Sequence, residues 1–476
     1  MGQPRAPQTP LVGTEPGKYV TNWCVQNVQL KVTLVNSTGG DFVRPFQNGL
    51  VTLLACLLLA GCSLASELSD KDRALMDRID RSLARAADYL VACQSKNGGW
   101  FSTTYGALRK DPSITPHVLS CLHFLPDRNG ESVNRSAYDR GVVYLAQLVL
   151  REGVEAGTAP DTVYTVYLAA EASRIMVTGG HTERRLRAQQ AWLKRLRSHH
   201  MVEPLGWKPG DQDYGGWGYA IQPPRKPSGD ALRNRYDWAN LSATMYGMGA
   251  LRSAHVPPTD PVYAQVRVFV ERCQNFEADV ERRDLKFDDG GFFFAPYRAM
   301  HNKAGAAGRD RYGRERFHSY GSTTADGLRC LLHCGLAPDH PRVRAAWSWL
   351  QRHYAIDANP GAFDEDREHL RKATYYYYVW SLAHVVLHMK VRTIQTPSGP
   401  RDGLAELAGH LMRLQREDGT WVNEIGTGKE DDPLVATPFA ASALAICRYM
   451  IAGPSSKTTS CRKKAAGHPS AVEKKE

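Results

Sequence analysis

Two pairs of neighbouring acidic residues are the first candidates for chemistry. Asp288-Asp289 lies in a glycine- and phenylalanine-rich stretch, and Asp431-Asp432 directly follows Glu430. Two adjacent carboxylates can hold one proton between them, because their mutual repulsion raises the pKa of one of the two. Such a pair could protonate a substrate, so all four aspartates are candidate catalytic residues. Capping of a turn or a helix is the commonplace alternative for an aspartate in these positions.

A second group of chemically capable residues follows the segment 297–317, which is polar and carries three glycines. Asp326, Cys330 and His333 are spaced i, i+4, i+7, so they share one face of a helix and could converge on zinc. A mostly buried helix face is the favoured interpretation, and we predict neither a metal nor a cofactor. Asp326 and His318 are retained as candidate catalytic residues.

A run of four tyrosines, Tyr375–Tyr378, opens an apolar helical stretch. Successive residues of a helix point about 100° apart, so one or two rings would face a cavity while the others pack into the core. Rings that face a cavity could stabilise a cation or stack on a sugar. The candidate ligand-binding residues are Tyr320, Tyr375, Tyr376, Tyr378, Trp238 and Trp380.

These residues sit in a pattern that recurs six times between residues 70 and 453. Each unit has a helical stretch that often ends near Gln, then a Gly-rich turn with an aromatic residue, then a second apolar helix. The apolar positions follow helical spacing; in one unit they are Leu328, Leu331, Leu332 and Leu336. Charged first helices and uncharged second helices predict an outer and an inner layer. One closed array of six hairpins therefore replaces the three domains suggested by length alone.

The recurring Gln and Gly-Gly-Trp resemble the repeats of the squalene-cyclase, terpenoid-cyclase and protein-prenyltransferase superfamily. Good matches occur at Gln94 with Gly98-Gly99-Trp100 and at Gln415 with Gly419-Thr420-Trp421. The Gly215-Gly216-Trp217 and Gly290-Gly291-Phe292 turns match as well. This resemblance implies an all-α fold, an α/α toroid around a central cavity. Gln94, Gln274, Gln351 and Gln415 are expected to be architectural, bonding to free helix-end groups.

Three functions are compatible with that resemblance. The first is a cyclase- or isomerase-like protein whose cavity takes an isoprenoid or other apolar small molecule, although the family's Asp-x-Asp-Asp acid run and its Asp-Asp-x-x-Asp run are both absent. The second is a non-catalytic surface lipoprotein that binds a protein or a glycan. The third is a polysaccharide lyase-like enzyme, for which His318 or Arg298 could contact an acidic sugar.

The N-terminal part of the chain has the features of a processing signal. The apolar run Leu50–Ala60 is too short for a bilayer span, and Leu59-Ala60-Gly61-Cys62 resembles a bacterial lipobox. The resemblance implies that Cys62 is acylated, giving an exported periplasmic or outer-membrane lipoprotein with no other membrane contact. We therefore predict a misannotated or disordered extension over 1–42, a signal peptide over 43–62, one toroid domain over 67–453 and a disordered basic tail over 454–476.

Composition bounds the remaining possibilities. The chain has 476 residues, 42% hydrophobic content and 23% charged content, as in a globular protein. Part of its formal net charge of +11 lies in the tail 454–476, which leaves a weakly basic body. A weakly basic domain does not have the charge distribution that is typical of proteins that bind double-stranded nucleic acid, so no nucleic-acid partner is expected.

Overall fold

The computed structural model describes residues 68–453, apart from 126–132, 152–153, 156–158, 230–232, 235 and 297–298. All of these belong to one compact unit, Arg44–Glu476. The expected N-terminal extension, the signal peptide with Cys62, the basic tail and Arg298 lie outside the described residues.

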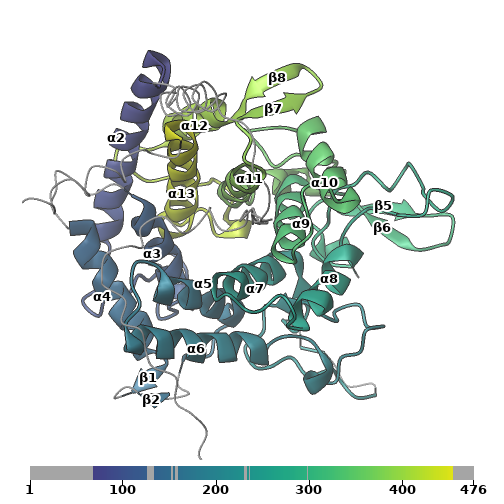
Figure 1. The fold of residues 1–476 in the computed structure, drawn as a ribbon, viewed down its shortest axis with the longest axis horizontal. Coiled ribbons are helices and arrows are strands. Elements are labelled where there is room, and N and C mark those ends of the chain that lie inside the picture. Colours follow the sequence, from purple (N-terminus) through teal and green to yellow (C-terminus); the bar gives the residue numbers. More distant parts are fainter. Residues whose placement is uncertain are drawn as a thin grey trace, which may run out of the picture. The chain divides into compact units, whose positions relative to one another are not determined.

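Within this unit, the helices alternate between an outer and an inner layer, and the fold is an α/α toroid of six hairpins (Figure 1). The outer helices are α2 (Asp70–Ala92), α4 (Val133–Gln147), α6 (Glu183–Ser198), α8 (Val262–Arg272), α10 (Pro341–Arg352) and α12 (Gly403–Leu414). The inner helices are α3 (Ile114–Phe124), α5 (Thr165–Val177), α7 (Leu241–Ser253), α9 (Gly321–His333), α11 (Tyr375–Met389) and α13 (Pro433–Ala452).

Each inner helix contacts the next, from α3 through α5, α7, α9 and α11 to α13, and α13 contacts α3 again, so the inner layer is a closed ring. Outer helices pack on it from outside: α4 on α3, α6 on α5, α10 on α9 and α2 on α13. Since the chain reverses direction within every hairpin, all six inner helices run the same way. Their N-termini therefore gather at one end of the ring, here called the N-terminal mouth.

The two layers differ in sequence as expected from their burial. Outer helix α10 buries one stripe, formed by Val343, Ala346, Trp349 and Leu350, and exposes its charged residues. Inner helices are covered on several sides; α13 is long and apolar enough to cross a membrane, but 67% of its most apolar stretch is buried in the fold.

Four short two-stranded antiparallel sheets and five 3₁₀ turns occupy the connections of the described chain. The strand pairs are β1 (Leu150–Arg151) with β2 (Val154–Glu155), β3 (Trp217–Gly218) with β4 (Ala239–Asn240), β5 (Ala306–Arg309) with β6 (Glu315–Phe317), and β7 (Thr393–Thr396) with β8 (Gly399–Asp402). The 3₁₀ turns are Gly106–Leu108, Glu203–Leu205, Ala299–His301, Glu365–Arg371 and Gly426–Gly428.

The repeated turns are held by the same hydrogen bonds in several hairpins. The backbone N–H groups of Trp100, Trp217, Phe292 and Trp421 each donate to a threonine hydroxyl in the following inner helix, at 2.9 to 3.2 Å. The side-chain amides of Gln94, Gln274 and Gln415 each donate to a glycine carbonyl of their own turn and to a carbonyl of the next outer helix. These glutamines link neighbouring hairpins, whereas Gln351 lies within α10 and makes no side-chain hydrogen bond to a described residue.

Candidate functional site

Asp326 is the centre of a polar cluster inside the ring, at the level of the N-terminal mouth. Its carboxylate is fully buried on α9 and accepts hydrogen bonds from Ser242 of α7 at 2.9 Å and from Ser381 of α11 at 2.6 Å. The Tyr377 hydroxyl donates to the same carboxylate at 2.7 Å. Three helices thus fix both carboxylate oxygens.

Burial raises the pKa of Asp326, against the opposing effect of the nearby Arg329 guanidinium and of the three hydroxyls. Arg329 lies one turn further along α9, with Nη1 3.9 Å from Asp326 Oδ1. Burial also raises the pKa of Tyr377 well above its ordinary value, so this phenol stays protonated and donates its hydrogen to the carboxylate. Burial thus favours the protonated form of Asp326, whereas Arg329 and the three hydroxyls favour the ionised form.

Aromatic side chains surround this carboxylate. The aromatic cluster consists of His117, Tyr167, Tyr219, Tyr246, Tyr377, Trp380 and Phe439. The Tyr246 ring contacts rings on α3, α5 and α11, at centroid distances of 5.0 to 5.6 Å. Because α3 and α11 are not neighbours of α7 in the ring, Tyr246 lies near the ring axis.

Most rings of the cluster are partly exposed. These are His117, Tyr167, Tyr219, Tyr377 and Phe439, whereas Tyr246 and Trp380 are buried. One face of Trp380 is covered by Arg329, whose Cζ lies 4.5 Å from the ring centroid. The rings open to a ligand are therefore those of His117, Tyr167, Tyr219, Tyr377 and Phe439.

Glu430 and Lys303 are charged residues beside this site. Both Glu430 oxygens accept backbone N–H groups at the start of α11, from Tyr376 at 3.0 Å and Tyr377 at 2.7 Å. Burial raises the pKa of Glu430 to about 7. Lys303 lies 3.5 Å from the Thr374 hydroxyl, and burial lowers the pKa of its ammonium group.

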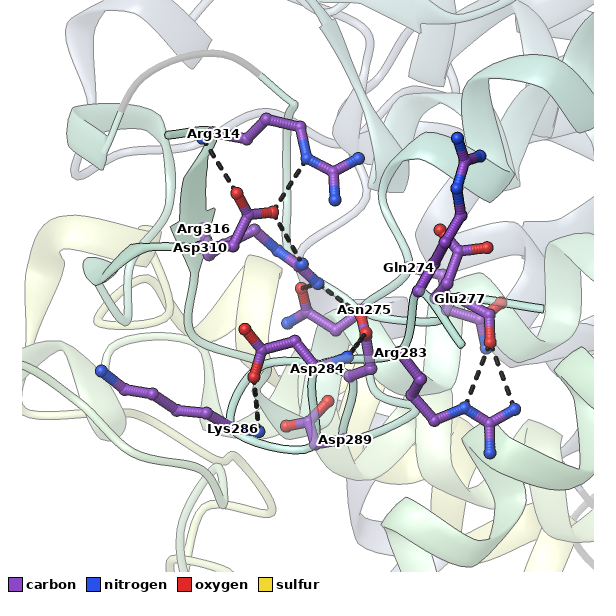
Figure 2. A network of polar contacts seen from close by, with 12 residues as sticks. Gln274, Asn275, Glu277, Arg283, Asp284, Lys286, Asp289, Asp310, Arg314 and Arg316 are labelled. Carbon is purple, nitrogen blue, oxygen red and sulfur yellow. Dashed lines mark hydrogen bonds and ion pairs between the residues drawn. The ribbon is translucent and has the colours of Figure 1, made fainter. Parts of the chain in front are cut away.

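The structure places the other predicted acidic residues in structural contacts outside this cluster. Asp288 accepts the Asp284 backbone N–H at 2.8 Å and pairs with Arg316 at 2.6 Å. Arg316 also contacts Asp310 and Asn275, and the network continues through the β5–β6 hairpin (Figure 2).

Asp289 accepts hydrogen bonds from Gly291 N, Ser319 Oγ and Trp349 Nε1, at 2.8 to 3.0 Å. It lines a small surface pocket of about 90 Å³ together with His318, whose Nε2 lies 3.4 Å from Asp364. Asp289 and His318 are thus predicted catalytic residues from separate segments of the described chain that line the same pocket.

Asp431 and Asp432 anchor the turn before α13. Asp431 accepts the Tyr105 hydroxyl, and Asp432 caps α13 through Leu434 N at 2.9 Å and also accepts the Ser102 hydroxyl. Asp432 is therefore a helix cap, the alternative role that the sequence suggests for such an aspartate.

Most of the predicted ligand-binding aromatics pack into the wall of the ring. Tyr375 and Tyr378 donate to the Ile356 and Ala355 carbonyls, at 2.6 and 2.8 Å, and the Tyr376 hydroxyl faces Val422 O at 3.4 Å. Tyr320 is 1% exposed at the start of α9. Trp238 stacks with Arg233, whose Cζ lies 3.7 Å from the ring centroid.

Sequence reasoning overlooked Tyr377, Glu430, Arg329 and Lys303. The helical periodicity of the tyrosine run predicts that at least one ring faces inward. That this ring is Tyr377 and that it meets Asp326 depends on how α11 is aligned with α9, which the sequence does not give. For Lys303 the sequence holds no comparable signal. Within the described residues, no group of three or more His, Cys, Asp and Glu side chains is placed to hold a metal.

Comparisons with known proteins give no family. No protein-family model matches the chain, and no curated protein matches it. Among solved structures, the type II terpene cyclase MstE from Scytonema is similar at 15% identity, covering 79% of this chain and 99% of its own, with a TM-score of 0.46.

Two carbohydrate-active proteins are similar to about the same degree. An unsaturated glucuronyl hydrolase specific for heparin is 13% identical, covering 78% of this chain and 97% of its own, with a TM-score of 0.49. An α-1,6-mannanase of Salegentibacter is 8% identical, covering 79% and 99%, with a TM-score of 0.46. Neither terpene cyclisation nor carbohydrate cleavage follows from similarity at this level, so the function has to be argued from the site.

Proposed function

We propose that the protein binds a largely apolar, isoprenoid-like small molecule at the N-terminal mouth and that Asp326 protonates it. The reaction is an isomerisation or cyclisation without an external co-reactant. The observation that carries this proposal is the buried Asp326 carboxyl group, held by three hydroxyls beside the accessible rings of the aromatic cluster.

The chemistry follows from the surroundings of Asp326. Its proton adds to a carbon–carbon double bond, and the resulting carbocation is stabilised by the partly exposed rings of Tyr167, Tyr377 and Phe439. A proton from a neighbouring carbon then returns to the Asp326 carboxylate, so the product is an isomer of the substrate. Tyr377, which donates to Asp326, positions the acid.

An assay for isomers of unchanged mass tests the proposal. The purified full-length protein is incubated with squalene, geranylgeraniol and related polyprenyl compounds, and products are separated by gas chromatography–mass spectrometry. Asp326→Asn should abolish conversion, and Tyr377→Phe should reduce it about tenfold or more, as expected when a hydrogen bond to a charged group is lost. Asp339→Asn, at an exposed position of the α9–α10 connection, is the matched control.

Tyr377→Phe keeps the Asp326–Arg329 pair and separates a chemical effect from misfolding. Wild-type turnover in both Asp326→Asn and Tyr377→Phe would refute the role of Asp326. Binding of an acidic oligosaccharide, with no binding of any isoprenoid, would favour the lyase-like alternative; binding without turnover would favour the non-catalytic one.

We further propose that the protein is exported and anchored through an acylated Cys62. The support is the lipobox-like sequence Leu59-Ala60-Gly61-Cys62 after an apolar run. Metabolic labelling with a fatty-acid analogue should label the wild-type protein but not Cys62→Ser. Equal labelling of both would contradict the anchor.

A further inference from the structure

A second polar region borders the aromatic cluster on the side of the C-terminal ends of the inner helices and shares Tyr246 with it. Trp380 is its common neighbour: Arg329 stacks on the Trp380 ring, Tyr246 stacks at a centroid distance of 5.6 Å, and His384 contacts it at 4.7 Å. We call Arg329, Tyr246 and His384 the inner polar site.

Two buried donors of this site have no hydrogen-bond partner. Arg329 is 3% exposed and Tyr246 is 2% exposed, yet the Arg329 Nε and the Tyr246 hydroxyl are both unsatisfied. Buried polar groups are nearly always paired, because leaving one unpaired costs the full free energy of its desolvation. Two unpaired donors that flank the same ring therefore point to an acceptor that completes the site.

Two arginines and two carboxylates surround the site, so the unpaired donors, rather than a net positive charge, call for an acceptor. Burial lowers the pKa of Arg329, and the charge of Arg174 of α5, which pairs with Glu171 at 2.5 Å, acts in the same direction. Asp326 is the carboxylate closest to Arg329, but it also accepts three hydroxyl groups. An oxyanion at the inner polar site would be held by Arg329 through a charge-assisted hydrogen bond.

His384 supplies a complementary acceptor. Its Nδ1 faces the Trp380 carbonyl at 3.0 Å, so Nδ1 carries the proton and Nε2 is left as an acceptor. Burial lowers the pKa of His384 well below its usual range, and this keeps the ring neutral. A neutral Nε2 accepts a hydrogen bond from an acidic hydroxyl, such as the P–OH of hydrogen phosphate.

The C-terminal ends of α9 and α11 lie on the side opposite the N-terminal mouth. His333 and His388 there are partly exposed, and their rings contact each other at 5.3 Å. This is the end from which we expect a small ligand to approach.

We infer that the inner polar site binds a phosphate-like oxyanion, either free or as the acidic end of a larger molecule, through Arg329, the Tyr246 hydroxyl and His384. The inner polar site shares Arg329 and Tyr246 with the surroundings of Asp326, but the inference does not require Asp326 to act as an acid, since it predicts binding without turnover.

Tyr246→Phe is the sharpest test, because it removes only an unpaired hydroxyl. The full-length protein and the variant are compared by thermal denaturation and calorimetric titration with inorganic phosphate at pH 7, with chloride at equal ionic strength as reference. Without phosphate, Tyr246→Phe should melt at the same temperature as the wild type or higher. Its affinity for phosphate should be about tenfold weaker, the loss expected for one hydrogen bond to a charged group.

Further variants and probes complete the design. Arg329→Gln should lose phosphate binding, whereas Tyr449→Phe and Arg344→Gln, both on exposed positions, should bind like the wild type. Phenyl phosphate that binds more tightly than inorganic phosphate would identify the acidic end of a larger ligand; equal affinity would identify the free ion. Absence of phosphate binding, or unchanged binding in Tyr246→Phe, would overturn the inference.

Discussion

Asp326 and Gly327, which are adjacent on α9, show how position changes the chemistry of a residue. Asp326 faces the ring interior and is protected from water. Gly327 faces the repeat turn, where a Cβ atom would come within 2.4 Å of the Phe292 ring. The glycine is therefore needed for the close approach of α9 to the turn that precedes it.

Gly327→Ala should destabilise the protein although alanine is the better helix former. Glycine-to-alanine exchange inside a helix ordinarily stabilises by about 1 kcal/mol, but overpacking against Phe292 should cost about 1 to 3 kcal/mol. Gly409→Ala in α12 is the matched control, because the nearest atom is the flexible end of Arg413, at 3.6 Å. Chemical denaturation should give opposite signs for the two variants; stabilisation by both would contradict the packing.

The tyrosine run marks the limit of what residue types alone can predict. The sequence predicts that one or two of the four rings face inward, and the structure selects Tyr377, which was not among the candidates. The selection depends on the rotation of α11 about its axis, which is set by contacts with α9 and α13 that are distant in sequence. Asp326 was predictable as a chemically capable residue, whereas its three hydroxyl partners were not.

At the scale of the helical elements, the repeat glutamine is a connector between hairpins. Gln415 illustrates this, because it donates to Ser82 O of α2 at 2.9 Å and to Gly419 O of its own turn at 3.0 Å. It also accepts the Ser82 hydroxyl at 2.7 Å. The sequence pattern was sufficient to predict the six hairpins, since helical periodicity and the Gly-rich turns are local signals.

The third hairpin uses a different residue to hold its turn. His200 takes the place of the glutamine there, with its Nε2 3.0 Å from Gly215 O and its ring stacked on Trp217 at 3.9 Å. The sequence pattern does not reveal this replacement, because a histidine alone does not signal a turn. Gln351 has the right residue type but lies within α10, away from the connector position.

Gln415→Met should weaken the contact between the last and the first hairpin. Methionine has nearly the same size but satisfies neither carbonyl, so we expect a loss of about 1 to 3 kcal/mol in the free energy of unfolding. Urea denaturation followed by circular dichroism measures this loss. Gln351→Met is the control and should change stability by less than about 0.5 kcal/mol; an equal loss in both would rule out a connector role.

At the scale of the whole molecule, buried histidines make stability depend on pH. Burial lowers the pKa of His200 from its ordinary 6.5 to about 4. Between these two values the unfolded chain binds more protons than the folded one, so stability is lost as the pH falls through this window. The pKa of Glu430, raised from 4.5 to about 7, acts in the opposite sense. Between these two values Glu430 is ionised in the unfolded chain and protonated in the folded one, so stability is lost as the pH rises through this window.

His200→Gln should reduce the acid-induced loss of stability. The shift of the His200 pKa corresponds to about 3 kcal/mol. The free energy of unfolding should therefore fall by about 3 kcal/mol less between pH 7 and pH 4 in the variant than in the wild type. Melting temperatures over this range measure the effect. The control, His369→Gln, changes an exposed histidine and should keep the pH dependence of the wild type. An unchanged pH dependence in His200→Gln would show that other groups cause the loss of stability at low pH.

The ring is closed by contacts between its first and last helices. Arg448 of α13 pairs with Asp80 of α2, and Arg392 pairs with Asp72 at 2.7 Å. These pairs join residues that are 368 and 320 positions apart in the chain. Closing a loop of that length costs conformational entropy before α2 reaches its final partner. Because the contacts that form join residues so far apart in sequence, this closure is expected to be slow. The side of α2 that packs on α13 cannot be covered until α13 has formed, so hydrogen-exchange pulse labelling during refolding should show α2 gaining protection after α5, α6 and α7.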